Sequence, residues 1–429
     1  MKDKRNFILY LMGRFISFIG TGIQQIAIPL FILDLTHSGV LMGVFSALNL
    51  VPNLITSPFA GILGDRKDRR KIMVVADFGR GILVCMLGFL AFGGSLNIYI
   101  LFGVQILISI MDSIFNSSSS AIIGELLEED ELMRAMSARG GLDAISMIIG
   151  PALGGIIYGF FGIKTVFFIN GISFILSGMM SALMIYVCRN HNHGKITIKA
   201  FFHENGEVLT FIKKDKGLMQ LAVFCMVSNL LVAPFIDIVM PYVVKKGIGF
   251  TSQQYGYMMA TFTVGVLAGN IILGVFAKNL KSKLVINLGL LIEGIMFFVL
   301  AIAVFPAQVK LFGGHSWILF AVLSGICLLI GAFNAFVNTP LQTNLQKMVP
   351  NDMRSRFFSL LGIFCQGAIP LGSIIYGILL DKFKYHYILI VVVILNAVVT
   401  AVFMMRAVED VYEPKVDEET VFRNVKSAQ

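Results

Sequence analysis

Long apolar runs divide nearly the whole chain, and short clusters of charged residues, glycine, proline or asparagine separate them. Each run is long enough for a helix that crosses a bilayer, which takes about 20 residues. The runs lack the period-two alternation over about 10 residues that is typical of membrane barrels. The pattern therefore predicts an all-α chain with twelve spans, at 7–34, 40–64, 72–94, 97–122, 136–161, 165–188, 217–244, 252–277, 283–304, 316–345, 355–380 and 385–406.

The composition requires an apolar surrounding. Of the 429 residues, 57% are hydrophobic and only 14% are charged, whereas soluble proteins carry about 25% charged residues. So few polar groups cannot cover a globular surface, and most of the exterior must face lipid. The sequence predicts an integral membrane protein and excludes a soluble multi-domain enzyme.

The basic residues are distributed unevenly over the connections. The termini and the even-numbered connections, together with the ends of the spans that border them, hold 26 of the 34 lysines and arginines, and the odd-numbered connections hold six. This positive-inside bias predicts that both termini are cytoplasmic in the cell membrane. The net charge of +9 then needs no nucleic-acid partner. The first apolar run is longer than a signal peptide and lacks a small-residue cleavage site, so we expect it to stay as a span.

The chain repeats itself internally. Residues 153–159 recur as 371–377, with six of seven identical at an offset of 218. Because six spans is an even number, the halves have the same orientation, and such a parallel repeat leaves a central cavity. The predicted domains are two six-helix bundles, a cytoplasmic linker between them and a cytoplasmic tail, at 1–188, 217–408, 189–216 and 409–429 respectively.

The connection after the second span carries a glycine, an acid and a basic cluster at fixed spacing, namely Gly61, Asp65, Arg66, Arg69 and Arg70. This connection resembles the loop signature of the major facilitator superfamily, with Asp68 where that pattern has glycine. The resemblance implies the major facilitator fold and a gate on the cytoplasmic side, in which Asp65 accepts from a helix N-terminus and pairs with Arg69. The alternative is that the arginines only fix the topology.

The fifth span contains Gly150, Pro151, Gly154 and Gly155. This segment resembles the signature of drug:proton antiporters, and the alternative is that the small residues only allow close helix packing. Further segments, with Asp77 and Arg80 among them, resemble the branch that holds macrolide-efflux and siderophore-export proteins. The resemblance implies a proton-coupled exporter.

Polar residues within several spans fall on single helix faces. Because polar groups that face lipid are costly, these faces should meet the protein interior or a wet cavity. A similar face in the sixth span, with Asn170 and Ser177, warns that such faces also serve helix packing. The candidates for the substrate cavity are Ser17, Thr21, Gln24, Gln25, Asn49, Asn53, Asn116, Asn334 and Asn338.

Charged residues inside the spans are sharper candidates. A rise of about 1.5 Å per residue places Arg14, Arg80, Asp112 and Asp143 at similar depth. Unpaired charges there are expensive, so we expect either arginine to pair with either acid. A buried carboxyl group that loses its partner can exchange a proton, and Asp112 is the first candidate for that role, with Glu293 the second. A static ion pair is the alternative.

Several chemistries have no signature in the chain. No phosphate-binding loop, nucleophile elbow or pair of catalytic carboxylates is present, so we expect neither an enzyme nor a cofactor. His191, His193 and His203 are predicted to lie in a solvated linker and to bind no metal.

We therefore predict a proton-coupled exporter of an amphipathic small molecule, such as a drug or macrolide. Its expected partners are substrate, protons and membrane lipid, and we expect a monomer. The alternatives are an uptake symporter or lipid flippase of the same fold, and a non-transporting membrane receptor.

Overall fold

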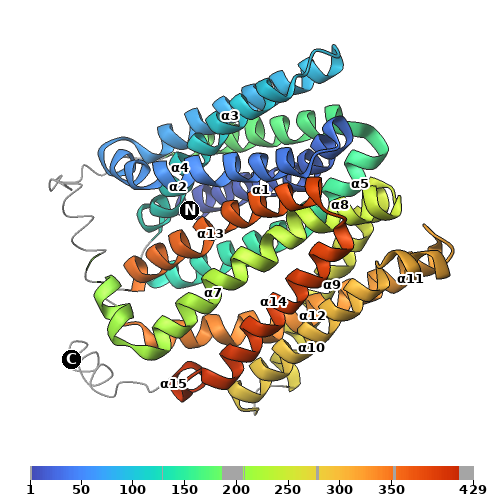
Figure 1. Cartoon of the computed structure of the whole chain (residues 1–429). Helices are drawn as coiled ribbons and strands as arrows, with labels where there is room; N and C mark the ends of the chain where they lie inside the picture. The colour runs from blue at the N-terminus through green and yellow to red at the C-terminus, as the bar shows by residue number, and fades with distance from the viewer. Residues whose placement is uncertain are drawn as a thin grey trace. The chain divides into compact units, whose positions relative to one another are not determined.

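The computed structural model describes residues 2–127, 129–185, 206, 208–276, 280–350 and 354–414, and all regular structure within them is helical (Figure 1). The first half of the chain forms α1 (Lys2–Thr36), α2 (Gly39–Arg66), α3 (Arg69–Phe92), α4 (Ile98–Leu126) and α5 (Glu129–Leu183). The second half forms α7 (Lys216–Pro234), η1 (Phe235–Val239), α8 (Met240–Tyr242), η2 (Val243–Ile248), α9 (Ser252–Phe276), α10 (Ser282–Ala303), α11 (Pro306–Leu311), α12 (Trp317–Met348), α13 (Arg354–Lys382), α14 (Tyr385–Arg406) and α15 (Glu409–Tyr412).

Eleven helices within the described residues are long and apolar enough to cross a membrane. One of them, α5, has 55 residues and is interrupted at Gly162, where φ is +73°. Glycine adopts this left-handed conformation without steric cost, so the chain turns there between two helical parts. These two parts correspond to the predicted spans 136–161 and 165–188. Most of the predicted linker, 189–216, lies outside the described residues, as do residues 415–429 of the predicted tail.

The predicted seventh span is one helical stretch that changes its winding. It runs from Lys216 to Ile248 and passes from α7 through the two π-helical turns η1 and η2. Prolines at 234 and 241 lack the backbone N–H that an α-helix needs, and a π turn absorbs such local irregularity. The stretch ends at Gly249, whose φ of +95° gives a left-handed helix end.

The described residues form two compact units. The first unit contains α1–α5 together with residues 235–260 and 373–384, and the second unit contains the rest. Within the first unit α5 packs against α1 and α3, and α2 packs against α4; within the second, α10 packs against α12 and α14. Each unit has its own buried apolar cluster, around Phe115 in the first and around Phe357 in the second.

The glycine-rich segment of α5 brings backbones together on two sides. On one side, Gly150 meets Gly22 of α1, where an added Cβ would lie 2.8 Å from the Gly22 Cα. On the other side, a Cβ at Gly155 would lie 2.7 Å from the backbone nitrogen of Gly256 in α9. Small residues at these points let the helix axes approach closely, which is how helices associate without a hydrophobic drive in lipid.

A side chain at position 155 should therefore force α5 and α9 apart. We expect Gly155→Val to destabilise the protein by about 1–3 kcal/mol through overpacking, measured as a lower thermal unfolding temperature of the purified protein in detergent. Gly103→Val is the control, since no atom lies within 4 Å of the Cβ that it adds to α4. Equal loss from both substitutions would contradict the assignment of the contact.

Candidate functional site

One arginine shared by two acids lies inside the first unit. The Arg80 side chain in α3 is only 3% exposed, and it forms ion pairs through Nη1 with Asp112 of α4 and through Nη2 with Asp77. The second oxygen of Asp77 accepts a hydrogen bond of 2.7 Å from Ser177 of α5. Three helices therefore meet at one charged group, which we call the Arg80 triad, consisting of Arg80, Asp77 and Asp112.

Aromatic rings complete the surroundings of this guanidinium. Its central carbon lies 4.4 Å from the ring centre of Phe115 and 4.3 Å from that of Phe174. Cation–π contacts of this kind stabilise a desolvated charge. The rings also exclude water from the arginine, so its two carboxylates supply the charge compensation.

The Arg80 triad has one positive charge for two carboxyl groups. If both acids are ionised, one negative charge is in excess, which is expensive in an apolar interior. A proton on either acid makes the triad neutral. The Asp77 side chain is completely buried, whereas that of Asp112 is 17% exposed. Asp112 is therefore the member of the triad that water can reach.

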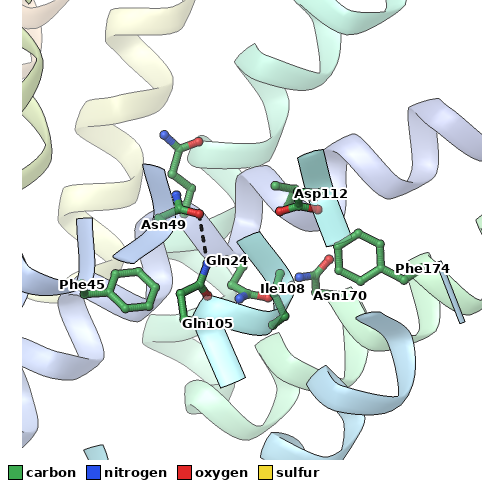
Figure 2. Close-up of a pocket in the computed structure, with 10 residues that line it drawn as sticks. Gln24, Phe45, Asn49, Gln105, Ile108, Asp112, Asn170 and Phe174 are labelled. Carbon is green, nitrogen blue, oxygen red and sulfur yellow. Dashed lines mark hydrogen bonds between the residues drawn. The ribbon is translucent and has the colours of Figure 1, made fainter. Parts of the chain in front are cut away.

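A small polar pocket leads to Asp112. Its volume is about 50 Å³, which holds a few water molecules but is far below the roughly 300 Å³ or more of drug-sized sites. Figure 2 shows amide side chains between Phe45 and Phe174, with Gln105 turned toward Asn49. The lining residues are Thr21, Gln24, Gln25, Phe45, Asn49, Gln105, Ile108, Asp112, Asn170 and Phe174.

Hydrogen bonds between amides fix the walls of this pocket. Gln105 donates to the Asn49 side chain over 2.9 Å, and Asn170 donates to Gln24. Gln105 is not among the residues predicted for the cavity, and Asn170 was grouped with Ser177 as an example of a polar face that can serve helix packing. Both lie on helices whose polar residues follow a helical spacing, but spacing alone does not separate a pocket wall from a packing contact.

The other candidates for the substrate cavity lie elsewhere. Ser17 is buried in α1 at 1% exposure, and Asn53 and Asn116 are half-buried, and none of the three lines the pocket. In the second unit, Asn334 donates to Glu293 over 3.1 Å, and Asn338 donates to Asn334.

A second ion pair joins α1 to α5. Arg14 donates from Nε and Nη2 to the two oxygens of Asp143, at 2.7 and 2.9 Å, and from Nη1 to Ser119 at 3.1 Å. Arg139 lies 3.6 Å from the same carboxylate. The predicted pairing of the buried arginines with the acids is therefore present, as Arg14 with Asp143 and Arg80 with Asp112. Here the balance is reversed, because two arginines face one acid.

The loop motif lies at the end of α2 and the start of α3. The side chains of Asp65 and Arg66 lie outside the described part of the structure, and Gly61 belongs to α2. Arg69 donates to the carbonyl of Ala121 and Arg70 to that of Ala182, near the C-terminal ends of α4 and α5, where cations are favourable. Asp68, the departure from the family pattern, caps α3 by accepting from the backbone nitrogen of Lys71 at 3.1 Å.

A third polar cluster lies where α1 ends. Asp34 accepts a hydrogen bond of 2.5 Å from the Tyr158 hydroxyl and forms an ion pair with Lys245 of η2. Lys245 also donates to Ser252 at 2.7 Å. We call these four residues the Asp34 cluster. It fastens the end of the seventh span to α1 and α5.

A carboxylate at the end of α13 strengthens the same region. Asp381 accepts from the Ser38 hydroxyl and the Gly39 backbone nitrogen, both at 2.6 Å, and so caps the N-terminus of α2. Lys246 donates to the carbonyl of His37 at 2.8 Å. These contacts were not predicted from the sequence, although Lys245 and Lys246 stand out as two of only six basic residues on the odd-numbered connections.

Comparison with known proteins agrees with this architecture. Residues 4–426 match the model of a family of the major facilitator type described as transmembrane secretion effector. Macrolide efflux protein A of Streptococcus pyogenes is 24% identical over 387 residues, which cover 90% of this chain and 91% of that protein. The staphyloferrin A transporter of Staphylococcus aureus is 23% identical over 381 residues, covering 87% and 89%.

A solved structure shares the fold. The bacterial homologue of the iron transporter ferroportin, crystallised in an inward-facing state, superposes with a TM-score of 0.69 at 16% sequence identity. The match covers 94% of this chain and 99% of that one.

Charge reversal tests whether the Asp34 cluster holds η2 in place. We expect Asp34→Lys or Lys245→Asp alone to loosen η2, because each places like charges together. Loosening is measured with a cysteine introduced at Val244, a position with no exposure. The rate at which maleimide labels this cysteine should rise by at least about fivefold, which corresponds to 1 kcal/mol. The double reversal should restore slow labelling.

Lys164→Asp is the control for this test. It reverses a lysine of the first unit that lies over the Phe92 ring and has no ion-pair partner within the described residues. Labelling as slow in the single reversals as in the parent protein would show that the cluster does not hold η2.

Proposed function

Since the chain belongs to the transmembrane secretion effector family of the major facilitator superfamily, and is thus a transporter and not an enzyme, we propose that it is a proton-coupled exporter. The proposed substrates are amphipathic small molecules of the drug or macrolide type, moved by alternating access. The macrolide efflux relative supports this substrate class. The observation that carries the proposal is the Arg80 triad, in which one of two buried acids borders a water-sized pocket.

Proton coupling follows from the charge of the triad. When Asp112 is neutral, Arg80 and Asp77 form a balanced pair that tolerates an apolar interior. When Asp112 is ionised, the extra negative charge favours a conformation in which water solvates it. The occupancy of one proton would therefore bias the conformation of the transporter, which is the requirement for coupling.

The other charged candidates receive different roles. Asp143 faces both Arg14 and Arg139, which compensate its charge, and we assign the Arg14 pair to holding α1 and α5 in register. Glu293 accepts from the neutral Asn334 side chain and has no ion-pair partner among the described residues. It is the second candidate proton carrier.

The substrate contacts are proposed on exposed polar positions within the spans. Thr21 and Gln25 in the first unit and Asn338 in the second are exposed, and polar side chains at membrane depth are costly against lipid. The pocket beside Asp112 is too small for a drug-sized molecule. Thr21 and Gln25 also line that pocket, so on this proposal the substrate contacts their exposed surface without entering the space beside Asp112.

The orientation follows from the basic residues, 26 of which lie on the side of the termini. With both termini cytoplasmic in the cell membrane, the loop motif is the cytoplasmic gate. The Asp34 cluster, at the opposite ends of the spans, is the external gate.

Transport in vesicles of known orientation tests the proposal. Inverted vesicles with an imposed proton gradient, acidic inside, should accumulate an amphipathic compound, such as a macrolide, and lose protons in exchange. Flux out of these vesicles together with protons would indicate an uptake symporter. Movement of labelled phospholipid would indicate a flippase, and binding without counterflow would indicate a receptor.

Substitution of the Asp112 carboxyl group tests the proton coupling most directly. We expect Asp112→Asn to abolish proton-driven accumulation, because an amide cannot exchange a proton, while the protein is still expressed in the membrane. Accumulation is measured at several external pH values in the same inverted vesicles.

Asp143→Asn is the matched control, since it removes the buried carboxylate that faces two arginines. It should lower the unfolding temperature but leave the pH dependence of transport unchanged. Unaltered pH-dependent accumulation in Asp112→Asn would remove this residue from the coupling mechanism.

A further inference from the structure

An apolar groove runs along the outside of the second unit between α7 and α14, which lie side by side in Figure 1. Its volume is about 380 Å³. Three residues of α7 and three of α14 form most of its walls, namely Val223, Phe224, Val227, Val398, Val402 and Phe403. The floor is firm, because Phe224 and Phe403 stack with their ring centres 4.0 Å apart.

The walls of this groove are open to the surroundings of the protein. Val223 is 47% exposed, Val398 is 54% exposed and Val402 is 43% exposed. Both helices are long and apolar enough to cross a membrane, so the medium that meets these valines is hydrocarbon and not water. A groove of this volume with apolar walls fits an acyl chain.

One end of the groove is basic. Gln220 donates from its side-chain nitrogen to the carbonyl of Arg406 at 2.9 Å and accepts from the Val408 nitrogen at 2.9 Å. These two bonds close the end of α14 and fix the position of Arg406 at the mouth of the groove. The exposed guanidinium of Arg406 has no hydrogen-bond or ion-pair partner within the described residues.

A lysine lies on the same helix face as the groove wall. Lys216, Gln220, Val223 and Val227 follow one another at spacings of four, three and four residues, which places them on one side of α7. Lys216 is exposed and stands in the first turn, one turn beyond Gln220. Two cations, Lys216 and Arg406, are therefore near the mouth.

We propose that this groove binds an anionic phospholipid, with one acyl chain between α7 and α14 and the phosphate at Arg406 and Lys216. The apolar walls select a lipid tail, and the two cations select a negative headgroup over a zwitterionic one. Basic sites between spanning helices near the membrane surface bind anionic lipids on this principle. The site is independent of the proposed proton coupling and of the transported compound.

Lipid retention by the full chain tests the site. The purified protein in detergent is titrated with dioleoyl phosphatidylglycerol or dioleoyl phosphatidylcholine, and the bound lipid is counted by native mass spectrometry. We expect one phosphatidylglycerol to be retained at concentrations where phosphatidylcholine is lost. Lys216→Gln and Arg406→Gln should each weaken its binding by about fivefold, since a basic residue near a lipid surface contributes about that factor.

Matched variants separate the groove from general effects. Val402→Trp, which fills the groove, should abolish retention, whereas Val391→Trp, at a 53% exposed valine of α14 outside the groove, should not. Lys347→Gln removes an exposed lysine at the end of α12 and should leave binding unchanged. Thermal unfolding temperatures identify any variant that is misfolded.

Three results would overturn the proposal. The first is equal retention of both lipids by the parent protein, a result that is obtained without any variant. The second is retention in Val402→Trp that equals that of Val391→Trp. The third is displacement of phosphatidylglycerol by inorganic phosphate at the same concentration, which would mean that the tail makes no contact with the groove.

Discussion

The need to compensate a guanidinium charge inside the membrane fixes the arrangement of the first unit. Arg80 is almost fully buried, and its two carboxylate partners come from α3 and α4, while Ser177 of α5 holds the second oxygen of Asp77. If any of these helices shifted, a charge would lose its partner in a medium where an unpaired ion costs several kcal/mol. The same charge pairing therefore constrains both the packing of α3, α4 and α5 and the chemistry of the site.

The two charge networks of this unit have opposite balances, and this difference assigns their roles. The Arg80 triad has an excess acid, whereas Asp143 faces both Arg14 and Arg139. An excess acid can become neutral by taking up a proton, but an acid with two cations gains nothing from one. On the proposed function, the first network is the one that responds to protons, and among its three members Asp112 borders the polar pocket.

Depth in the membrane could be predicted from the sequence, but lateral position could not. Run length and helical rise placed the spans and put Arg14, Arg80, Asp112 and Asp143 in one layer, and the structure contains two of the pairings that this layer allows. The sequence did not identify which arginine pairs with which acid, because the pairing depends on which helices are neighbours. The Asp34 cluster was missed for the same reason, since its members are distant in sequence and adjacent only after folding.

The size of the polar pocket restricts how substrate and proton can be coupled. A volume of about 50 Å³ admits water and excludes a drug-sized molecule, so on the proposed function substrate and proton do not compete for one site. Each must then act by favouring a different conformation, and the coupling is the difference in free energy that each ligand makes between those conformations. On the proposed function, the pocket beside Asp112 is therefore the same for every transported compound, and the exposed polar side chains of the spans determine substrate specificity.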